Sequence, residues 1–159
     1  MKFDITKLSL QPFTKEALDN TYEWLHDPEI QDLTLTPHFT KDDQLEWFRK
    51  LPERSDYIAK VIFAGGEMIG AWGLKNIDKE ASHAEHYYYI GNKDYWGSGI
   101  GSWVMSKSIE ACREINLSRI TATIFVKNFR IVNLHFKEGF RINKYQNEMY
   151  FMEKSLLTF

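Results

Sequence analysis

The sequence contains only one cysteine, Cys112, so it cannot form an internal disulfide bond. Its cysteine and histidine residues nowhere show the spacing of zinc ligands, and we therefore expect no metal site. No stretch approaches the roughly 20 consecutive apolar residues that span a bilayer. Residues 1–13 alternate polar and apolar side chains and lack the continuous apolar run of a signal peptide. These absences favour a cytoplasmic protein without a membrane partner.

The chain also lacks a strong excess of charge of either sign. Its 20 Lys and Arg residues and 22 Asp and Glu residues give a formal net charge of −2. A nucleic-acid partner normally requires a basic surface that neutralises phosphates, so we expect none here. Internal repeats and linkers rich in Pro, Gly or Ser are absent too, and residues 1–159 are therefore expected to form a single domain.

Apolar periodicity and turn residues divide the chain into strands and helices. The pattern predicts strands at residues 5–10, 57–64, 68–74, 84–90, 119–126 and 147–153, and helices at residues 14–26, 40–51, 99–115 and 128–138. Asp27-Pro28 ends the first helix, and Thr40 with Asp43 resembles an imperfect capping box for the second. Residues 30–39 show no clear pattern and are expected to lie over the substrate. The order predicts an α/β fold with a mixed sheet. The short connection from Phe140 to the final strand leaves little room for a long covering hairpin, which favours a more open acceptor site.

A glycine-rich loop between the strand at residues 84–90 and the next helix is the most informative segment. Gly97, Gly99 and Gly101 let the backbone approach a ligand and present N–H groups at a helix N-terminus, which favours a pyrophosphate. No Gly-Lys-Ser/Thr follows, so the loop is not a P-loop, and its spacing differs from the dinucleotide-binding fingerprint. Taken alone, the glycines fit a tight strand-to-helix turn equally well.

Two motifs in this part of the chain resemble the GNAT superfamily of acetyltransferases. The first is Trp96-Gly-Ser-Gly99-Ile-Gly101, which matches the glycines of the family pattern Arg/Gln-x-x-Gly-x-Gly/Ala. Trp96 departs from the Arg/Gln position, which puts one side-chain contact in doubt but not the backbone amides.

The second motif covers residues 128–140 and resembles the family pattern Asn-x-x-Ala-x-x-Leu-Tyr-x-x-x-Gly-Phe. The positions that match it are Asn128, Leu134, Gly139 and Phe140, and those that depart from it are Ile131 at the small residue and His135 at the tyrosine. The two motifs stand in the family's order, each on the expected element.

The resemblance implies a GNAT fold, with a mostly antiparallel sheet that is splayed in the middle, about four flanking helices and acetyl-CoA in the cleft. It also implies that the pantetheine arm pairs with the strand backbone and that the glycine-loop amides hold the pyrophosphate. The cofactor-binding residues implied in this way are Tyr88, Tyr89, Ile90, Trp96, Gly97, Ser98, Gly99, Ile100, Gly101, Ser102 and Asn128.

Acetyl transfer to an amine needs a base for the amine proton and an acid for the leaving thiolate. The resemblance implies Glu85, at the start of the central strand, as the base acting through water. It implies His135 as the acid, because a tyrosine often protonates the thiolate at this position. The alternatives are that Glu85 is an ordinary solvated or hydrogen-bonded carboxylate and that His135 merely packs beside the cofactor.

The acceptor amine is indicated only by the N-terminal half. Residues 24–48 resemble GNAT enzymes that acetylate nucleotide-linked amino sugars, such as the acetyltransferase of the pseudaminic acid pathway. Substrate contacts are then expected from His38, Phe39, Trp72 and Tyr87, although Trp72 also fits a core position. Spermidine and protein N-termini remain alternative acceptors, a non-catalytic acyl-CoA sensor remains an alternative role, and a homodimer is left open.

Overall fold

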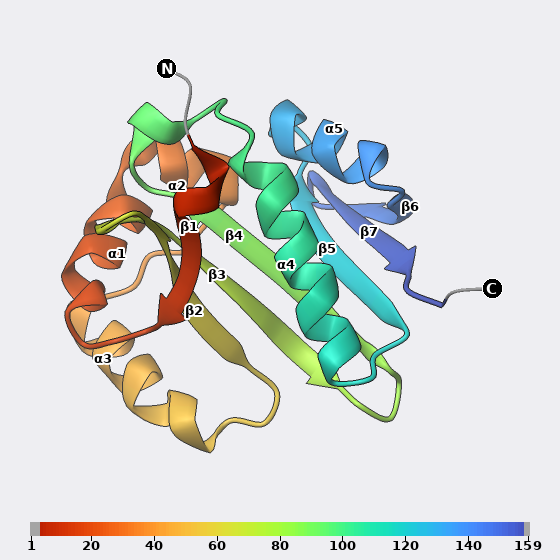
Figure 1. The fold of residues 1–159 in the computed structure, drawn as a ribbon, viewed down its shortest axis with the longest axis horizontal. Coiled ribbons are helices and arrows are strands. Elements are labelled where there is room, and N and C mark those ends of the chain that lie inside the picture. The colour runs from red at the N-terminus through yellow and green to blue at the C-terminus, as the bar shows by residue number, and fades with distance from the viewer. Residues whose placement is uncertain (1–3, 158–159) are drawn as a thin grey trace.

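The computed structural model describes residues 4–157, so the first three and the last two residues of the chain lie outside it. Within this range a seven-stranded sheet has the order β1-β2-β3-β4-β5-β7-β6. All neighbouring strands are antiparallel except β4 and β5, which confirms the predicted mixed, mostly antiparallel sheet (Figure 1). The strands are β1 (Leu8–Pro12), β2 (Ile58–Ala64), β3 (Glu67–Asp78), β4 (His83–Ile90), β5 (Arg119–Phe125), β6 (Arg141–Gln146) and β7 (Met149–Ser155).

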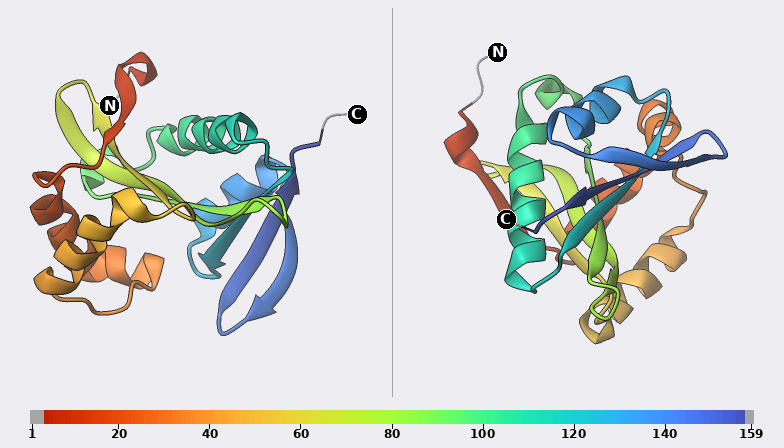
Figure 2. Two further views of the ribbon diagram at one scale, coloured as in Figure 1. Left: turned by 90° about the horizontal axis from the view of Figure 1, so that it is seen from below. Right: turned by 90° about the vertical axis from the view of Figure 1, so that its right-hand side faces the viewer.

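Helices cover both faces of this sheet. Helix α4 lies on one face, whereas α1, α2 and α3 lie together on the opposite face, and β5, β7 and β6 fan away from the other strands (Figure 2). The α-helices are α1 (Ala17–His26), α2 (Pro28–Thr34), α3 (Lys41–Lys50), α4 (Ile100–Glu114) and α5 (Phe129–Lys137); the 3₁₀ helices are η1 (Ile5–Lys7), η2 (Leu51–Glu53) and η3 (Lys93–Tyr95).

Helix α2 was not predicted, although the sequence contains a start signal for it. The Asp27 carboxylate accepts hydrogen bonds from the backbone N–H groups of Glu29 at 3.0 Å and Ile30 at 3.3 Å. Pro28 occupies the first helical position, where its missing N–H costs nothing. The Asp27-Pro28 pair therefore ends α1 and begins α2, whereas the sequence analysis used it only as a helix end.

The prediction that the connection after Phe140 leaves little room for a long hairpin was wrong, because this connection contains strand β6. Strands β6 and β7 form an antiparallel hairpin through Asn147 and Glu148, whose φ values of 53° and 61° are both left-handed. Such a pair is typical of a two-residue type I′ turn. All six residues of β6 are exposed, so the strand has no alternation of buried and exposed positions that the sequence could reveal.

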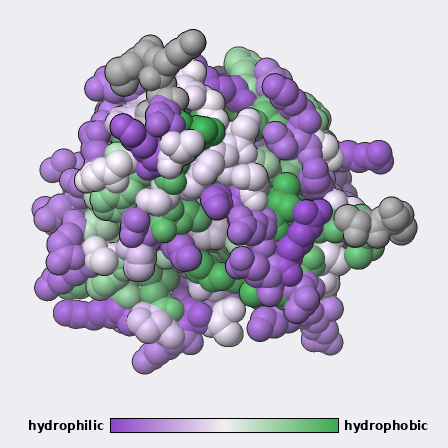
Figure 3. Space-filling view, in the orientation of Figure 1, coloured by the Kyte–Doolittle hydropathy of each residue, from purple (hydrophilic) through white to green (hydrophobic). Residues whose placement is uncertain are grey.

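The core lies between α4 and the sheet. Its fully buried side chains include Ile69, Leu74, Met105 and Ile120. On the face that carries α4, hydrophilic side chains are spread widely and hydrophobic ones appear in small groups between them (Figure 3). Among residues 4–157, no helix has both the length and the apolar character that crossing a membrane requires.

The pairing of β4 with β5 stops early, and this opening positions the site. The two strands pair from His83–Arg119 only as far as Glu85–Thr121. On its other side, β4 stays paired with β3 up to Ile90. Beyond Glu85 the β5-facing edge of β4 therefore has no strand beside it, which is the splayed sheet that the family resemblance implied.

Candidate active site

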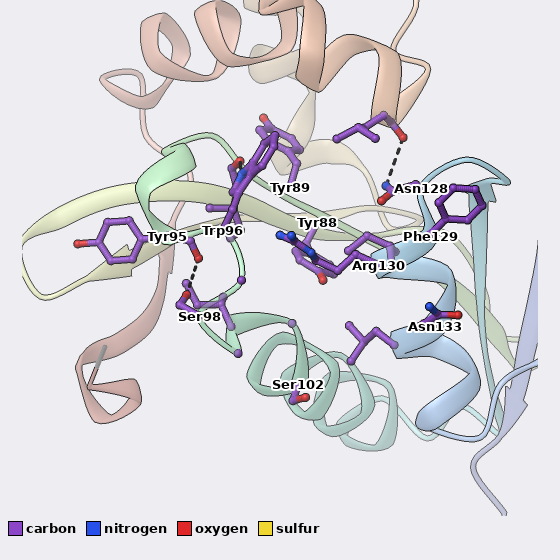
Figure 4. A pocket seen from close by; sticks show the side chains of 18 of the residues that line it. Tyr88, Tyr89, Tyr95, Trp96, Ser98, Ser102, Asn128, Phe129, Arg130 and Asn133 are labelled. Atoms are coloured by element: carbon purple, nitrogen blue, oxygen red, sulfur yellow. Dashed lines mark hydrogen bonds between the residues drawn. The ribbon is translucent and has the colours of Figure 1, made fainter. Parts of the chain in front are cut away.

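A cavity of about 600 Å³ lies where β4 and β5 separate. Its walls come from the end of β4, the loop before α4, the first turn of α4, the exposed side of α5 and part of α2 (Figure 4). All the cofactor-binding residues named from the sequence line this one cavity, from Tyr88–Ile90 and Trp96–Ser102 to Asn128. The structure thus brings together residues up to 40 positions apart in the chain.

The glycine loop turns the chain from β4 into α4 beside this cavity. Gly97 and Gly99 have φ values of 75° and 84°, in the left-handed region that favours glycine. Gly99 is the N-cap of α4, and no side chain caps the helix. The first N–H groups of α4 therefore have no side-chain acceptor, and together with the helix dipole they form a site suited to an anion.

The third glycine of the motif serves packing between helices. A Cβ atom at Gly101 would lie 2.7 Å from the Leu134 side chain and 2.8 Å from the Tyr88 hydroxyl. Real Cβ atoms do not approach so closely, so a larger residue here would displace the ends of the Leu134 and Tyr88 side chains. Gly99 differs, because a Cβ atom at this position would meet nothing within 4 Å.

Positive charge surrounds the cavity. Lys127, Arg130 and Lys137 line it, and no carboxylate does. None of these cations forms an ion pair with a side chain in the described part of the chain. The Arg130 guanidinium lies beside the glycine loop, 3.9 Å from the position that a Cβ atom of Gly97 would take. The sequence analysis missed these cations, although all three lie in or next to the second motif.

Trp96 stands where the family pattern of the first motif has arginine or glutamine. Its indole N–H donates to the backbone carbonyl of Ile90 at 2.8 Å. The side chain thus ties the loop to the end of β4 and brings no charge to the cavity. Arg130, from α5, supplies a cation at the same loop instead.

Asn128 joins two walls of the cavity. Its side-chain amide donates to the backbone carbonyl of Leu33 at 3.3 Å, which links the start of α5 to the end of α2. Both residues line the cavity.

Glu85 lies outside the cavity, at the last β4 position that pairs with β5. Its carboxylate is 3.5 Å from the Lys75 ammonium and accepts a hydrogen bond from the Asn76 amide at 3.3 Å. The side chain is 17% exposed, so water reaches it. Two residues along β4, the Tyr87 hydroxyl accepts a hydrogen bond from the Tyr57 hydroxyl at 2.7 Å, and burial raises the pKa of Tyr87.

His135 does not occupy the position that a general acid would need. It is only 2% exposed and does not line the cavity. Its Nε2 atom is 2.8 Å from Nε2 of His86, and its Nδ1 atom is 2.8 Å from the carbonyl oxygen of Ile131. Burial lowers the pKa of both histidines, that of His86 to about 3, with a smaller contribution from the neighbouring ring of His135. Both rings are therefore neutral, and the predicted acid is a buried hydrogen-bonded residue.

None of the four predicted substrate contacts lines the cavity. Trp72 is 2% exposed and donates its indole N–H to the Ser108 hydroxyl at 2.8 Å, so it is a core residue. His38 and Phe39 belong to the loop between α2 and α3, where the Phe39 carbonyl lies 3.0 Å from Nε2 of His26. Tyr87, the fourth, faces Tyr57 on the sheet face covered by α1 to α3.

Two other chemistries find no support in residues 4–157. No group of three or more His, Cys, Asp or Glu side chains comes together there as a metal site would require. Cys112 is buried in α4, and burial raises the pKa of its thiol to about 11, so the thiol stays protonated at neutral pH.

Comparisons with known proteins agree with this geometry. The family model described as an acetyltransferase (GNAT) domain matches residues 7–141. The uncharacterized N-acetyltransferase p20 of Bacillus licheniformis is 25% identical over 135 residues, which cover 80% of this chain and 75% of that protein.

Two solved structures share the fold. The spermidine N-acetyltransferase of Vibrio cholerae, in complex with CoA and spermine, has a TM-score of 0.85 at 18% identity, with 95% of this chain and 96% of that chain covered. The N-acetyltransferase PseH of Campylobacter jejuni, in complex with acetyl coenzyme A, has a TM-score of 0.72 at 17% identity, with 93% and 98% covered.

We expect the buried histidine pair to make the fold sensitive to mild acid. The unfolded chain binds a proton on each ring as pH falls through about 6.5, whereas the folded chain keeps His86 neutral down to about pH 3. Stability is therefore highest above pH 6.5 and is lost as pH falls, by about 1 kcal/mol between pH 6.5 and 5.5 for His86, and the lowered pKa of His135 adds to this loss. Urea unfolding at the two pH values measures this loss. The double variant His86→Leu/His135→Leu should lose less than half as much, and an unchanged loss would contradict the assignment.

Proposed function

The chain belongs to the GNAT acetyltransferase family and is thus an N-acetyltransferase, and we propose that the cavity between β4 and β5 binds its acetyl-CoA. The observation that carries this proposal is the set of cations around the glycine loop. Lys127, Arg130 and Lys137 are exposed, unpaired with any carboxylate of residues 4–157, and gathered beside the uncapped start of α4. A phosphate-bearing ligand would satisfy both the helix amides and these charges.

The residues present fit such a ligand. Gly99 leaves open space at the loop, so a diphosphate can approach the backbone there. We propose that Arg130 pairs with the diphosphate, in the place of the family arginine that Trp96 replaced. In an antiparallel ladder alternate residues turn their N–H and C=O groups away from the partner strand. The free edge of β4 near Tyr88 to Ile90 therefore offers backbone groups to an extended amide-containing arm.

The reaction needs few groups from the protein. The bound thioester supplies the electrophilic carbonyl, and an N–H on the free edge of β4 can polarise it. Glu85 would accept the amine proton through water, because its carboxylate is reached by solvent. Of the three tyrosines that line the cavity, burial raises the pKa of Tyr88 and Tyr89, so both stay protonated and can hydrogen-bond to a leaving thiolate.

For the acceptor we propose the amino group of a nucleotide-linked sugar. The sheet face opposite α4 carries several aromatic rings, which suit stacking on a sugar or base. Trp24 packs edge-to-face on Tyr89 with 6.5 Å between centroids, and Tyr57 contacts Tyr87. A polyamine would need several carboxylates, and Asp27, Glu29 and Asp32 lie close together in the sequence. Of these three, Asp27 is already engaged, because it caps α2 and pairs with Lys93 at 2.9 Å.

A polyamine is the second candidate acceptor. The similarity in fold to the spermidine N-acetyltransferase of Vibrio cholerae supports it. A protein N-terminus remains a further alternative, and a non-catalytic acyl-CoA sensor remains the alternative of another class.

The test is release of free CoA thiol from acetyl-CoA across a panel of amines. We expect turnover with 3-amino or 4-amino nucleotide sugars and little with spermidine, spermine or peptides with free N-termini. Faster turnover with a polyamine would transfer the assignment to the second candidate. CoA binding by calorimetry with no turnover on any amine would favour the sensor.

We expect Arg130→Ala to weaken cofactor binding specifically. Loss of one charge-assisted contact costs about 1.5–3 kcal/mol, so the Kd for CoA should rise roughly 10-fold to 100-fold. Calorimetry with CoA measures the change, and acetyl-pantetheine, which lacks the diphosphate, should be used as substrate in parallel. The variant should use acetyl-pantetheine as well as the wild type does.

Arg113→Ala is the matched control, because this arginine is exposed in the last turn of α4, away from the glycine loop. It should bind CoA with wild-type affinity. The proposed contact between Arg130 and the diphosphate would be contradicted if the Arg130→Ala protein bound CoA normally. It would also be contradicted if the variant were as impaired with acetyl-pantetheine as with acetyl-CoA.

Glu85→Gln tests the proposed base. General-base catalysis typically contributes about 10²–10⁴-fold, so kcat should fall by a factor in this range. The Kd for CoA should not change, because Glu85 does not line the cavity. Steady-state rates with saturating acetyl-CoA measure the effect, and Glu80→Gln in the β3–β4 turn is the control. A variant with wild-type kcat would show that Glu85 is only a partner of Lys75.

A further inference from the structure

His86 stands at the point where the β4–β5 ladder ends. Glu85 is the last β4 residue paired with β5, and Tyr88, two residues beyond His86, already lines the cavity. From His86 onward, β4 is therefore paired with β3 alone. Across the gap, the opposite wall of the cavity is α5, which carries His135.

A continuous chain of hydrogen bonds crosses this gap. Nε2 of His86 is 2.8 Å from Nε2 of His135, and Nδ1 of His86 is 2.8 Å from the hydroxyl of Ser108 on α4. The Trp72 indole N–H, from β3, donates to the same hydroxyl at 2.8 Å. At the other end, Nδ1 of His135 lies 2.8 Å from the carbonyl oxygen of Ile131, one turn back in α5. These bonds thus join strands β3 and β4 to helices α4 and α5 next to the cavity.

With both rings neutral, the protons of this chain can be arranged in one way only. The Ile131 carbonyl can only accept, so Nδ1 of His135 carries a proton and its Nε2 must accept. Nε2 of His86 therefore donates to His135, and Nδ1 of His86 accepts from the Ser108 hydroxyl. That hydroxyl in turn accepts from Trp72, so every donor has an acceptor. Each link is directional and has no spare partner among residues 4–157.

The second GNAT motif holds this arrangement in place. The Phe140 ring stacks on His86 at 5.8 Å and packs edge-to-face on His135 at 4.7 Å. Gly139, with φ of 91°, follows the end of α5 and donates its N–H to the Phe136 carbonyl at 3.1 Å, and the Phe140 N–H donates to the His135 carbonyl at 2.9 Å. These two bonds at the helix end are typical of a Schellman motif. The motif's last two residues therefore cover the histidine pair.

We propose that the chain Trp72–Ser108–His86–His135–Ile131 sets the distance between the free end of β4 and α5, and thereby keeps the cofactor cavity in its binding shape. His86 and His135 are positioning residues for the cofactor, since neither ring lines the cavity. This inference rests on the proposed acetyl-CoA site. Apolar packing between the two walls would allow several separations, whereas the bond between the rings allows one, and a cavity already in shape binds more tightly.

The decisive comparison separates cofactor affinity from stability. His135→Leu leaves the His86 N–H buried without an acceptor and should lower the melting temperature by about 5 °C or more. His86→Leu/His135→Leu removes the unpaired His86 N–H but leaves the buried Ser108 hydroxyl without its acceptor, so only part of that stability should return. We expect the Kd for CoA, measured by calorimetry well below melting, to stay at least about 10-fold weaker in both variants. The KM for acetyl-CoA should rise with it, while kcat changes less than about three-fold.

Two further variants serve as controls. His135→Gln places an amide oxygen near the position of Nε2, keeps an acceptor for His86 and should retain the Kd within about three-fold. Met152→Leu alters a buried core residue outside the chain and should bind CoA as the wild type does, whatever its melting temperature.

A double variant that binds CoA with wild-type affinity would overturn the inference, since stability alone would then explain the histidines. Should the double variant not fold, equal affinities of His135→Gln and His135→Leu would overturn it equally. A wild-type protein that binds no CoA would contradict the proposed function itself, and the inference with it.

Discussion

The structure depends on the end of the β4–β5 ladder at Glu85 and Thr121. A parallel pair inside a sheet is normally buried and continuous, because each strand satisfies the backbone groups of its neighbour. Here β4 continues for five residues without that neighbour. The separation creates both the cavity and a row of backbone groups that face it. It also removes the backbone hydrogen bonds that would otherwise hold the two halves of the sheet together. Helices α2, α4 and α5 must therefore hold the opening in place.

The side chains that hold the opening differ in character from those that face its interior. Trp96 on Ile90, Asn128 on Leu33 and the histidine pair each join two elements by hydrogen bonds with one donor and one acceptor. The interior carries cations that have no carboxylate partner among the residues described. Like charges that lie close together repel one another, which opposes folding, and a bound anion would offset that repulsion. The arrangement therefore suits the proposed phosphate-bearing ligand, and the bonds around the cavity would keep the opening fixed.

Sequence reasoning brought the expected cofactor residues to one cavity, whereas it placed other residues less well. The glycine loop could be located because backbone geometry constrains it: a left-handed N-cap at Gly99 and a close approach at Gly101 disfavour other residues. The burial of His135 could not be predicted, because a motif gives a position along a helix and not the direction of its side chain. Successive residues in an α-helix turn by about 100°. Arg130, Leu134 and Lys137 thus share one side of α5, and His135, next to Leu134, points toward the core with Val132. Strand β6 could not be predicted, since a fully exposed edge strand carries no apolar pattern.

The two faces of the sheet differ in how their charges are satisfied, and this bears on the acceptor. On the cofactor face the cations lack partners in the described chain. On the opposite face some charges are paired within the protein: Glu85 with Lys75, and Arg54 with Asp56 through two bonds of 2.9 Å. A polycation that bound Glu85 or Asp56 would only exchange one ion pair for another, which yields little free energy. The exposed α2 carboxylates of Glu29 and Asp32 form no ion pair within residues 4–157. Aromatic rings such as Tyr87 and Tyr89 would support the proposed ring-bearing amine through shape and stacking, whereas Glu29 and Asp32 would support a polyamine.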